Sequence, residues 1–280
     1  MGENRCCVKR NSAATAIQST SQPVKGSLRV VAKPCRVLVV DSLLLISTAL
    51  IACGGRGDKG GVAPILLFNG TGTSPNDVAA LEAVLNRNDL SYSTANSAQL
   101  NEMDESQLRG YRLLVIPGGN FIHIGKGLTS STTATIRGAV QNGLNYLGIC
   151  AGGFFAGDSG FNGLNLTSGV RFRFYSAEDR GIRKAAVAIA AAGAPTLDHY
   201  WEDGPQFTGW GAAVGKYPDG TPAVVEGTFG RGWVVLSGVH PEAPASWRRG
   251  MIFTTPVDAD NAYAATLIRA ALNRIVLPHY

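Results

Sequence analysis

Short apolar runs alternate with amphipathic segments along the chain from about residue 64 onward. The runs "ILLF" (65–68), "YRLLVI" (111–116) and "LNYLGI" (144–149) are nearly continuous, which is typical of strands buried on both faces of a parallel sheet. The segments between them, "TSPNDVAALEAVLNRN" (73–88) and "TATIRGAVQNG" (133–143), have the spacing of helices. Strands that alternate with helices predict an α/β fold with a doubly wound, mostly parallel sheet.

The first of these helices carries a start signal. We expect Ser74 at its N-cap and Pro75 at its first helical position, with Asp77 completing a capping box. Its apolar positions fall on one face and predict the side that packs on the sheet. They are Val78, Leu81 and Leu85.

The remaining elements are less regular. Residues 91–95 predict a weak strand, and residues 103–110 predict a short helix. After residue 160 the chain becomes richer in β-structure, with strands expected in "AAVGKY", "PAVVEGTF" and "GWVVLSGVH". A final helix, at about 259–275, is expected to pack back on the sheet.

The net charge of +5 lies in the N-terminal part of the chain. Seven Lys and Arg residues and two acidic residues precede Cys53, and 18 residues of each sign follow from there onward. The predicted domain is therefore neutral, and it lacks the basic excess expected of a nucleic-acid-binding protein.

The N-terminal part has the layout of a secretory leader. Basic residues end at Arg36, and an almost continuous apolar run of 16 residues follows at 37–52. This run is short for a membrane span, which needs ~20 apolar residues, and it suits a signal sequence. It ends in "LIAC", which resembles the lipobox of bacterial lipoproteins, and this resemblance implies a lipid on Cys53 after cleavage before it.

We therefore expect a leader at 1–52, a Gly-rich tether at 53–63 and a folded domain at 64–280, held at the membrane of the cell envelope by its lipid. Asp41 interrupts the apolar run and the basic segment before it is long. An uncleaved N-terminal anchor and a translation start near residue 30 are therefore alternatives. Without a signal, the domain would be cytoplasmic.

Cys150 is the one cysteine of the predicted domain, because the other four lie in the leader or at its end. A lone cysteine builds neither an intrachain disulfide nor a cysteine-rich metal site, and we expect no metal and no cofactor. A buried structural thiol is the simplest alternative to a reactive one.

The glycines around Cys150 favour a reactive thiol. "GICAG" (148–152) fits G-x-C-x-G, the thiol counterpart of the nucleophile elbow, at the carboxyl end of a predicted strand. The turn strains the nucleophile's backbone, and a side chain at either flanking glycine would collide with neighbouring backbone. The helix that follows directs free amides toward the sulfur and favours the thiolate.

A catalytic base and an oxyanion site for Cys150 are also predicted from residues at the ends of predicted strands. His240 also emerges at the end of a predicted strand, and Glu242, two residues later, can fix its tautomer. Backbone amides of Ala151 and of "IPGGN", through Gly118 and Gly119, are expected to hold an oxyanion. An ordinary surface His–Glu pair and an ordinary Pro-Gly turn are the simpler alternatives.

Five segments in order resemble the biotin–protein ligase N-terminal domain family of the class I glutamine amidotransferase-like superfamily. They are "LFNGTGTSP", "IPGGN", "YLGICAGGFFAG", "YWEDGPQF" and "HPE", within residues 64–275. The resemblance implies a flavodoxin-like sheet and a triad of Cys150, His240 and Glu242.

The predicted function is that of a lipid-anchored cysteine hydrolase or amidase acting on a small-molecule or peptide amide. The alternative is a non-catalytic lipoprotein that binds a ligand or partner in the same pocket. The candidate substrate-binding residues are Asn69, Tyr200, Trp201 and Asp203, for which a packed aromatic loop with solvated acids is the other interpretation.

Overall fold

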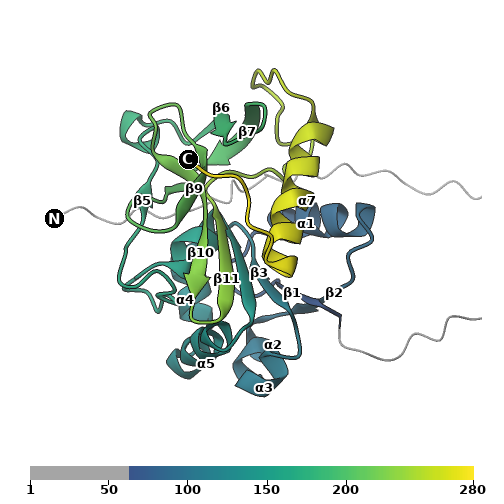
Figure 1. The fold of residues 1–280 in the computed structure, drawn as a ribbon, viewed down its shortest axis with the longest axis vertical. Helices are drawn as coiled ribbons and strands as arrows, with labels where there is room; N and C mark the ends of the chain where they lie inside the picture. The colour runs from purple at the N-terminus through teal and green to yellow at the C-terminus, as the bar shows by residue number, and fades with distance from the viewer. Residues whose placement is uncertain (1–62) are drawn as a thin grey trace, which may run out of the picture. The chain divides into compact units, whose positions relative to one another are not determined.

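The fold is seen in a computed structural model of the chain, which describes residues 63–280. The predicted leader and all but the last residue of the predicted tether lie outside this range. Nine strands form one sheet in the order β2-β1-β3-β4-β11-β10-β9-β6-β7 (Figure 1).

The first half of this sheet is parallel. Its strands are β2 (Tyr92–Ala95), β1 (Ile65–Phe68), β3 (Leu113–Ile116), β4 (Asn145–Ile149) and β11 (Gly232–Ser237). Each pairs in parallel with its neighbour, and the chain order 2-1-3-4-5 is that of flavodoxin-like sheets. The predicted fold class is therefore confirmed.

The second half is antiparallel. It consists of β10 (Pro222–Phe229), β9 (Ala212–Lys216), β6 (Lys184–Ala191) and β7 (Leu197–Glu202). A separate two-stranded sheet joins β5 (Arg173–Phe174) to β8 (Pro205–Gln206), and a short 3₁₀ helix spans Glu178–Arg180. Of the strands expected after residue 160, "AAVGKY" and "PAVVEGTF" correspond to β9 and β10, and "GWVVLSGVH" corresponds to β11 of the parallel half. Strands β6 and β7 were not predicted.

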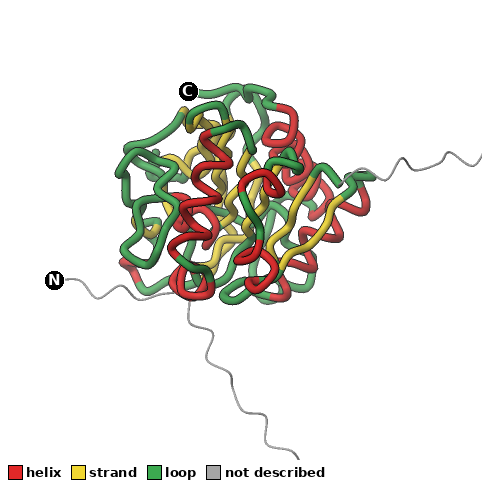
Figure 2. Tube along the Cα trace, turned by 90° about the horizontal axis from the view of Figure 1, so that it is seen from below, coloured by secondary structure: helices red, strands yellow, loops and turns green. Residues whose placement is uncertain are grey.

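Helices cover both faces of the parallel half, as the alternation of its side chains requires. Ile65 and Leu67 pack with α1 (Pro75–Arg87) and α7 (Val257–Asn273), whereas Leu66 and Phe68 face the opposite core. The helices on that side are α2 (Ser97–Glu102), α3 (Glu105–Leu108), α4 (Phe121–Gly127), α5 (Ser130–Gln141) and α6 (Ala151–Ala156). In Figure 2 the helices, in red, flank the strands, in yellow.

Two local predictions differ from the structure. The capping box is wrong, because the Ser74 side chain makes no capping hydrogen bond and the Asp77 carboxylate lies against His240 instead. Helix α4 is unexpected, since "FIHIGKG" contains two glycines in seven residues. It begins because the Asn120 side chain accepts hydrogen bonds from the amides of Ile122 and His123.

The glycines of the elbow are required by close backbone packing. A Cβ on Gly148 would lie 2.5 Å from the carbonyl oxygen of Gly152, and a Cβ on Gly152 would overlap the carbonyl oxygen of Ile116 in β3. These contacts let α6 begin directly against the sheet, at the point where β4 ends.

We expect Gly152→Ala to lower the free energy of unfolding by about 1–3 kcal/mol, the usual cost of overpacking a close contact. Gly160→Ala is the matched control, because a Cβ there meets only the Arg171 guanidinium at 4.0 Å. Urea unfolding of both variants checks this. Equal stability of the two would contradict the close packing of α6 on β3.

Candidate active site

Cys150 stands between β4 and α6 in a backbone conformation that few residues with side chains adopt. Its φ is 50° and its ψ is −105°. The turn is fixed from both sides, because the Cys150 amide donates to the carbonyl of Ser237 (2.7 Å) and its carbonyl accepts from Gly153 and Phe154. Such strain persists only where neighbouring structure imposes it, and it is common at functional sites.

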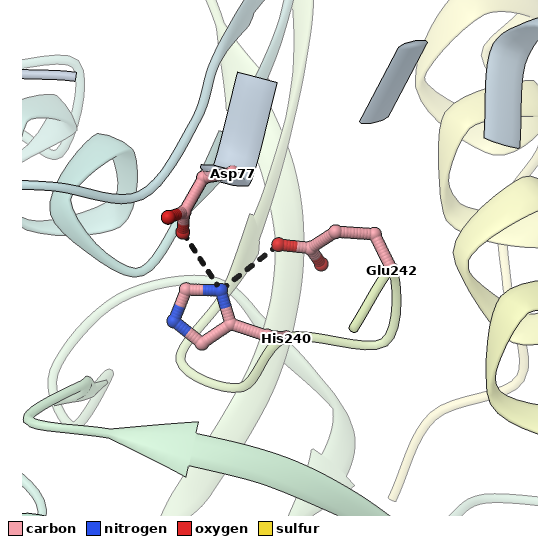
Figure 3. Close-up of side chains that lie close together, drawn as sticks. All are labelled: Asp77, His240 and Glu242. Atoms are coloured by element: carbon pink, nitrogen blue, oxygen red, sulfur yellow. Dashed lines mark hydrogen bonds and ion pairs between the residues drawn. The ribbon is translucent and has the colours of Figure 1, made fainter. Parts of the chain in front are cut away.

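His240 lies three residues beyond the end of β11, with its ring buried. Its Nδ1 is 2.9 Å from Oε1 of Glu242, within hydrogen-bond distance, and 3.2 Å from Oδ1 of Asp77. Figure 3 shows both carboxylates facing this one nitrogen, while the second ring nitrogen points away from them. All three side chains are at most 9% exposed, so their interactions are weakly screened.

These carboxylates decide the charge of His240. Burial, the largest single influence, lowers the pKa of the imidazole, but it is outweighed by the charge and hydrogen bond of Glu242 and by the charges of Asp77 and Glu202. Together they raise the pKa of His240 from 6.5 to about 9. The ring is therefore an imidazolium at neutral pH.

Strand β7 connects the cysteine with the histidine. The Cys150 thiol donates to the carbonyl of Glu202 (Sγ to O, 3.5 Å), and the His240 amide donates to the carbonyl of Tyr200 (2.8 Å). The Tyr200 hydroxyl also donates to the Glu202 carboxylate (2.6 Å), and its ring lies edge-on to His240. Residues two positions apart on one strand thus contact both groups.

The glycines of "IPGGN" lie beside this cluster. A Cβ on Gly118 would overlap the Asp77 carboxylate and lie 2.7 Å from Cε1 of His240. Gly119 has a φ of 141°, in the region that favours glycine. Among the backbone hydrogen bonds of loops and turns within residues 63–280, none is donated by the Gly119 or the Ala151 amide.

The structure separates the four candidate substrate-binding residues. Tyr200 is the one that contacts His240. Asn69 is exposed at the end of β1, and Asp203 pairs with Arg183 at 3.5 Å. Trp201 is fully buried, with its indole donating to the Gly204 carbonyl, so it is a core residue rather than part of an entrance.

Sequence reasoning missed Asp77 and Trp247, both of which contact His240. Asp77 had a usable signal, because it lies in the first turn of the helix that follows β1. Side chains at that position stand at the carboxyl edge of a parallel sheet, where ligand and catalytic groups gather. Trp247 lies in an irregular segment and had no such signal.

A cavity of about 730 Å³, in the size range of small-molecule sites, is lined by residues of α4, α6 and the segments that follow α6, and neither Cys150 nor His240 is among its lining residues. Phe121, two residues beyond Gly119, stacks on Phe154, four residues beyond Cys150, and both rings line this cavity. Phe161 and Phe174 extend the aromatic wall. Arg171, Arg173 and several acidic side chains complete the lining.

Asp77, His240 and Glu242 are also the group within residues 63–280 whose ligand atoms lie close enough, within 4.8 Å, to hold a metal ion. A metal would need the unprotonated Nδ1 of His240. A metal ion at this place would therefore compete with the proton that His240 holds on Nδ1.

The comparison with protein families gives a match over part of the chain. Residues 63–181 match the model of the family described as "Biotin-protein ligase, N terminal". The resemblance to this family drawn from the sequence is thereby confirmed for these residues. The matched residues include Asp77, Gly119 and Cys150, and they end before β7 and His240. A search of curated proteins gave no match.

Solved structures with related folds share little sequence with this chain. An exo-beta-1,4-mannosidase from Opitutaceae bacterium strain TAV5 is 14% identical (TM-score 0.49), with 73% of this chain and 36% of that one covered. A protein described as a putative GMP synthase subunit, from Thermoplasma acidophilum, is 12% identical with a TM-score of 0.48, and the match covers 75% of this chain and 96% of that one. A beta-galactosidase from Halorubrum lacusprofundi is 18% identical with a TM-score of 0.45, and the match covers 76% of this chain and 31% of that one. The chain thus spans about a third of the two glycosidases.

The raised pKa of His240 predicts a pH-dependent stability. Because the folded-state value of about 9 exceeds the ~6.5 of an unfolded chain, the charged ring stabilises the fold fully below pH ~6.5. This contribution, up to about 3 kcal/mol, is lost as the pH rises through 9.

Urea unfolding between pH 6 and 9.5 checks this prediction. It is best done with Cys150→Ala in both proteins, so that the thiol does not titrate. The free energy of unfolding should fall with pH in the protein that keeps His240, and His240→Gln should remove most of that fall. Parallel curves for the two proteins would show that His240 is not charged in the native state.

Proposed function

We propose that this chain is a cysteine-dependent amide hydrolase in which Cys150 is the nucleophile. The observation that carries the proposal is the strained Cys150 elbow joined through β7 to a buried, charged His240. Nucleophilic cysteines are activated in this way, by a neighbouring imidazolium and the start of a helix.

In the first step the Cys150 thiolate attacks the amide carbonyl carbon, and the C–N bond breaks. The His240 imidazolium gives its proton to the leaving nitrogen, which departs as an amine or ammonia and leaves a thioester on Cys150. The amides of Gly119 and Ala151 are the donors offered to the developing oxyanion. Glu242 keeps the ring oriented through Nδ1.

In the second step water attacks the thioester carbonyl. His240, now neutral, accepts a proton from that water, and the C–S bond breaks to release a carboxylic acid. The cycle restores the thiolate and the imidazolium. The cavity lined by Phe121 and Phe154 is the space that we propose for the rest of a small-molecule or peptide amide.

The second candidate function is ligand binding without turnover in the same cavity. It is favoured by the burial of Cys150, whose side chain is 2% exposed and donates to the Glu202 carbonyl in this structure. A thiol in that contact is protonated and shielded. Thiol reactivity separates the two functions, because an enzyme needs a thiolate that a reagent can reach.

The rate of Cys150 alkylation by iodoacetamide, measured against pH, tests the hydrolase. We expect alkylation at pH 7 in the wild type and a reduction of at least tenfold in His240→Ala, because the imidazolium that stabilises the thiolate is lost. Cys150→Ala gives the blank and should leave no turnover of any amide found in a screen, without unfolding the domain. Slow alkylation that His240→Ala does not change would favour the binding protein.

We also propose that the domain is held at a membrane through a lipid on Cys53, as the "LIAC" segment indicates. Within residues 63–280 no helix is long and apolar enough to cross a bilayer.

The test is expression in a bacterial host fed a radiolabelled fatty acid. We expect label on the wild-type chain and on Cys150→Ala, but none on Cys53→Ala, which should also leave the membrane fraction. Equal labelling of Cys53→Ala would contradict the anchor.

A further inference from the structure

We propose that Asp77 is a second positioning carboxylate of the site, which supplies charge to His240 while Glu242 supplies the orienting hydrogen bond. The contact between Asp77 and His240 follows from the geometry of the structure. A part for that contact in catalysis rests on the proposed function.

The two carboxylates make different contacts with one nitrogen. Glu242 Oε1 lies 2.9 Å from Nδ1 of His240 in hydrogen-bond geometry, whereas Asp77 Oδ1 lies 3.2 Å away as an ion pair. Nδ1 carries a single proton and can direct it at one acceptor. Glu242 therefore fixes the tautomer and the ring plane, and the effect of Asp77 is electrostatic.

Asp77 has a position in the fold that Glu242 does not share. It occupies the first turn of α1, a 13-residue helix, where the free amides and the helix dipole stabilise an anion. The side chain is 9% exposed, so its charge acts on His240 through a weakly polar interior. A buried carboxylate held in this way favours the imidazolium over the neutral ring.

Gly118 explains how the contact is possible. Any side chain at this position would overlap the Asp77 carboxylate and press on the His240 ring. The glycine that precedes the oxyanion residue Gly119 thus also makes room for Asp77. Helix α1, the loop after β3 and the loop after β11 converge at this point.

Other groups also face His240 and must be held constant in a test. Glu202 adds a negative charge from β7, and Tyr200 and Trp247 lie edge-on to the ring. None of them belongs to α1. A substitution on α1 that changes only the carboxylate therefore isolates the contribution of Asp77.

The test compares Asp77→Asn with Glu82→Gln, a carboxylate-to-amide change on the same helix. Titration of His240 is followed by NMR with Cys150→Ala in every protein, so the readout needs neither turnover nor a thiol. We expect Asp77→Asn to lower the titration midpoint by about one pH unit, a tenfold change in the proton equilibrium. Glu82→Gln should leave it unchanged, and Asp77→Glu should restore part of the shift.

Equal midpoints in Asp77→Asn and Glu82→Gln overturn the proposal. So does a stoichiometric zinc ion in the wild-type protein that Asp77→Asn loses, because Asp77 would then be a ligand. Alkylation of Cys150 in the same variants tests the catalytic meaning separately. If Asp77→Asn shifts the titration midpoint of His240 but leaves the alkylation rate of Cys150 unchanged, the effect of Asp77 on His240 is supported and the proposed hydrolase function is contradicted.

Discussion

The site depends on one buried imidazole that is surrounded by negative charge. His240 is nearly inaccessible to water, and a charged group in such a place is stable only if its partners replace the lost hydration. Glu242 and Asp77 do so from two different parts of the chain. Removing either would leave a buried charge with one partner fewer, so the ring, the two carboxylates and the glycine loop form a single unit.

The antiparallel half of the sheet has a direct part in this unit. In a flavodoxin-like sheet the parallel strands alone bring the ends of β4 and β11 side by side, which places Cys150 near the turn that leads to His240. Strand β7 then covers the pair, with one carbonyl on the thiol and another on the His240 amide. Strand β7 thus covers the carboxyl ends of β4 and β11, where Cys150 and His240 lie.

The sequence predicted those features that depend on neighbours along the chain. The elbow follows from glycines within two residues of Cys150, and the His240–Glu242 pair from a spacing of two. Long-range contacts were not predictable in this way. Asp77 is 163 positions from His240, and its place in a helix start had a satisfactory local explanation as a cap. Trp201 was misplaced for a similar reason, since an aromatic residue between polar ones suits an entrance as well as a strand packed against a core.

The contact between Cys150 and Glu202 bears on how the site would act. A thiol donates to a carbonyl oxygen, but a thiolate is repelled by it, so the charged form of Cys150 and this contact exclude one another. Loss of the Cys150 proton therefore removes the hydrogen bond by which β7 holds the sulfur. Because Tyr200 and Glu202 share this strand, a shift of β7 that frees the sulfur also alters the packing on His240. The contact that covers the Cys150 sulfur and the packing around His240 thus belong to the same strand.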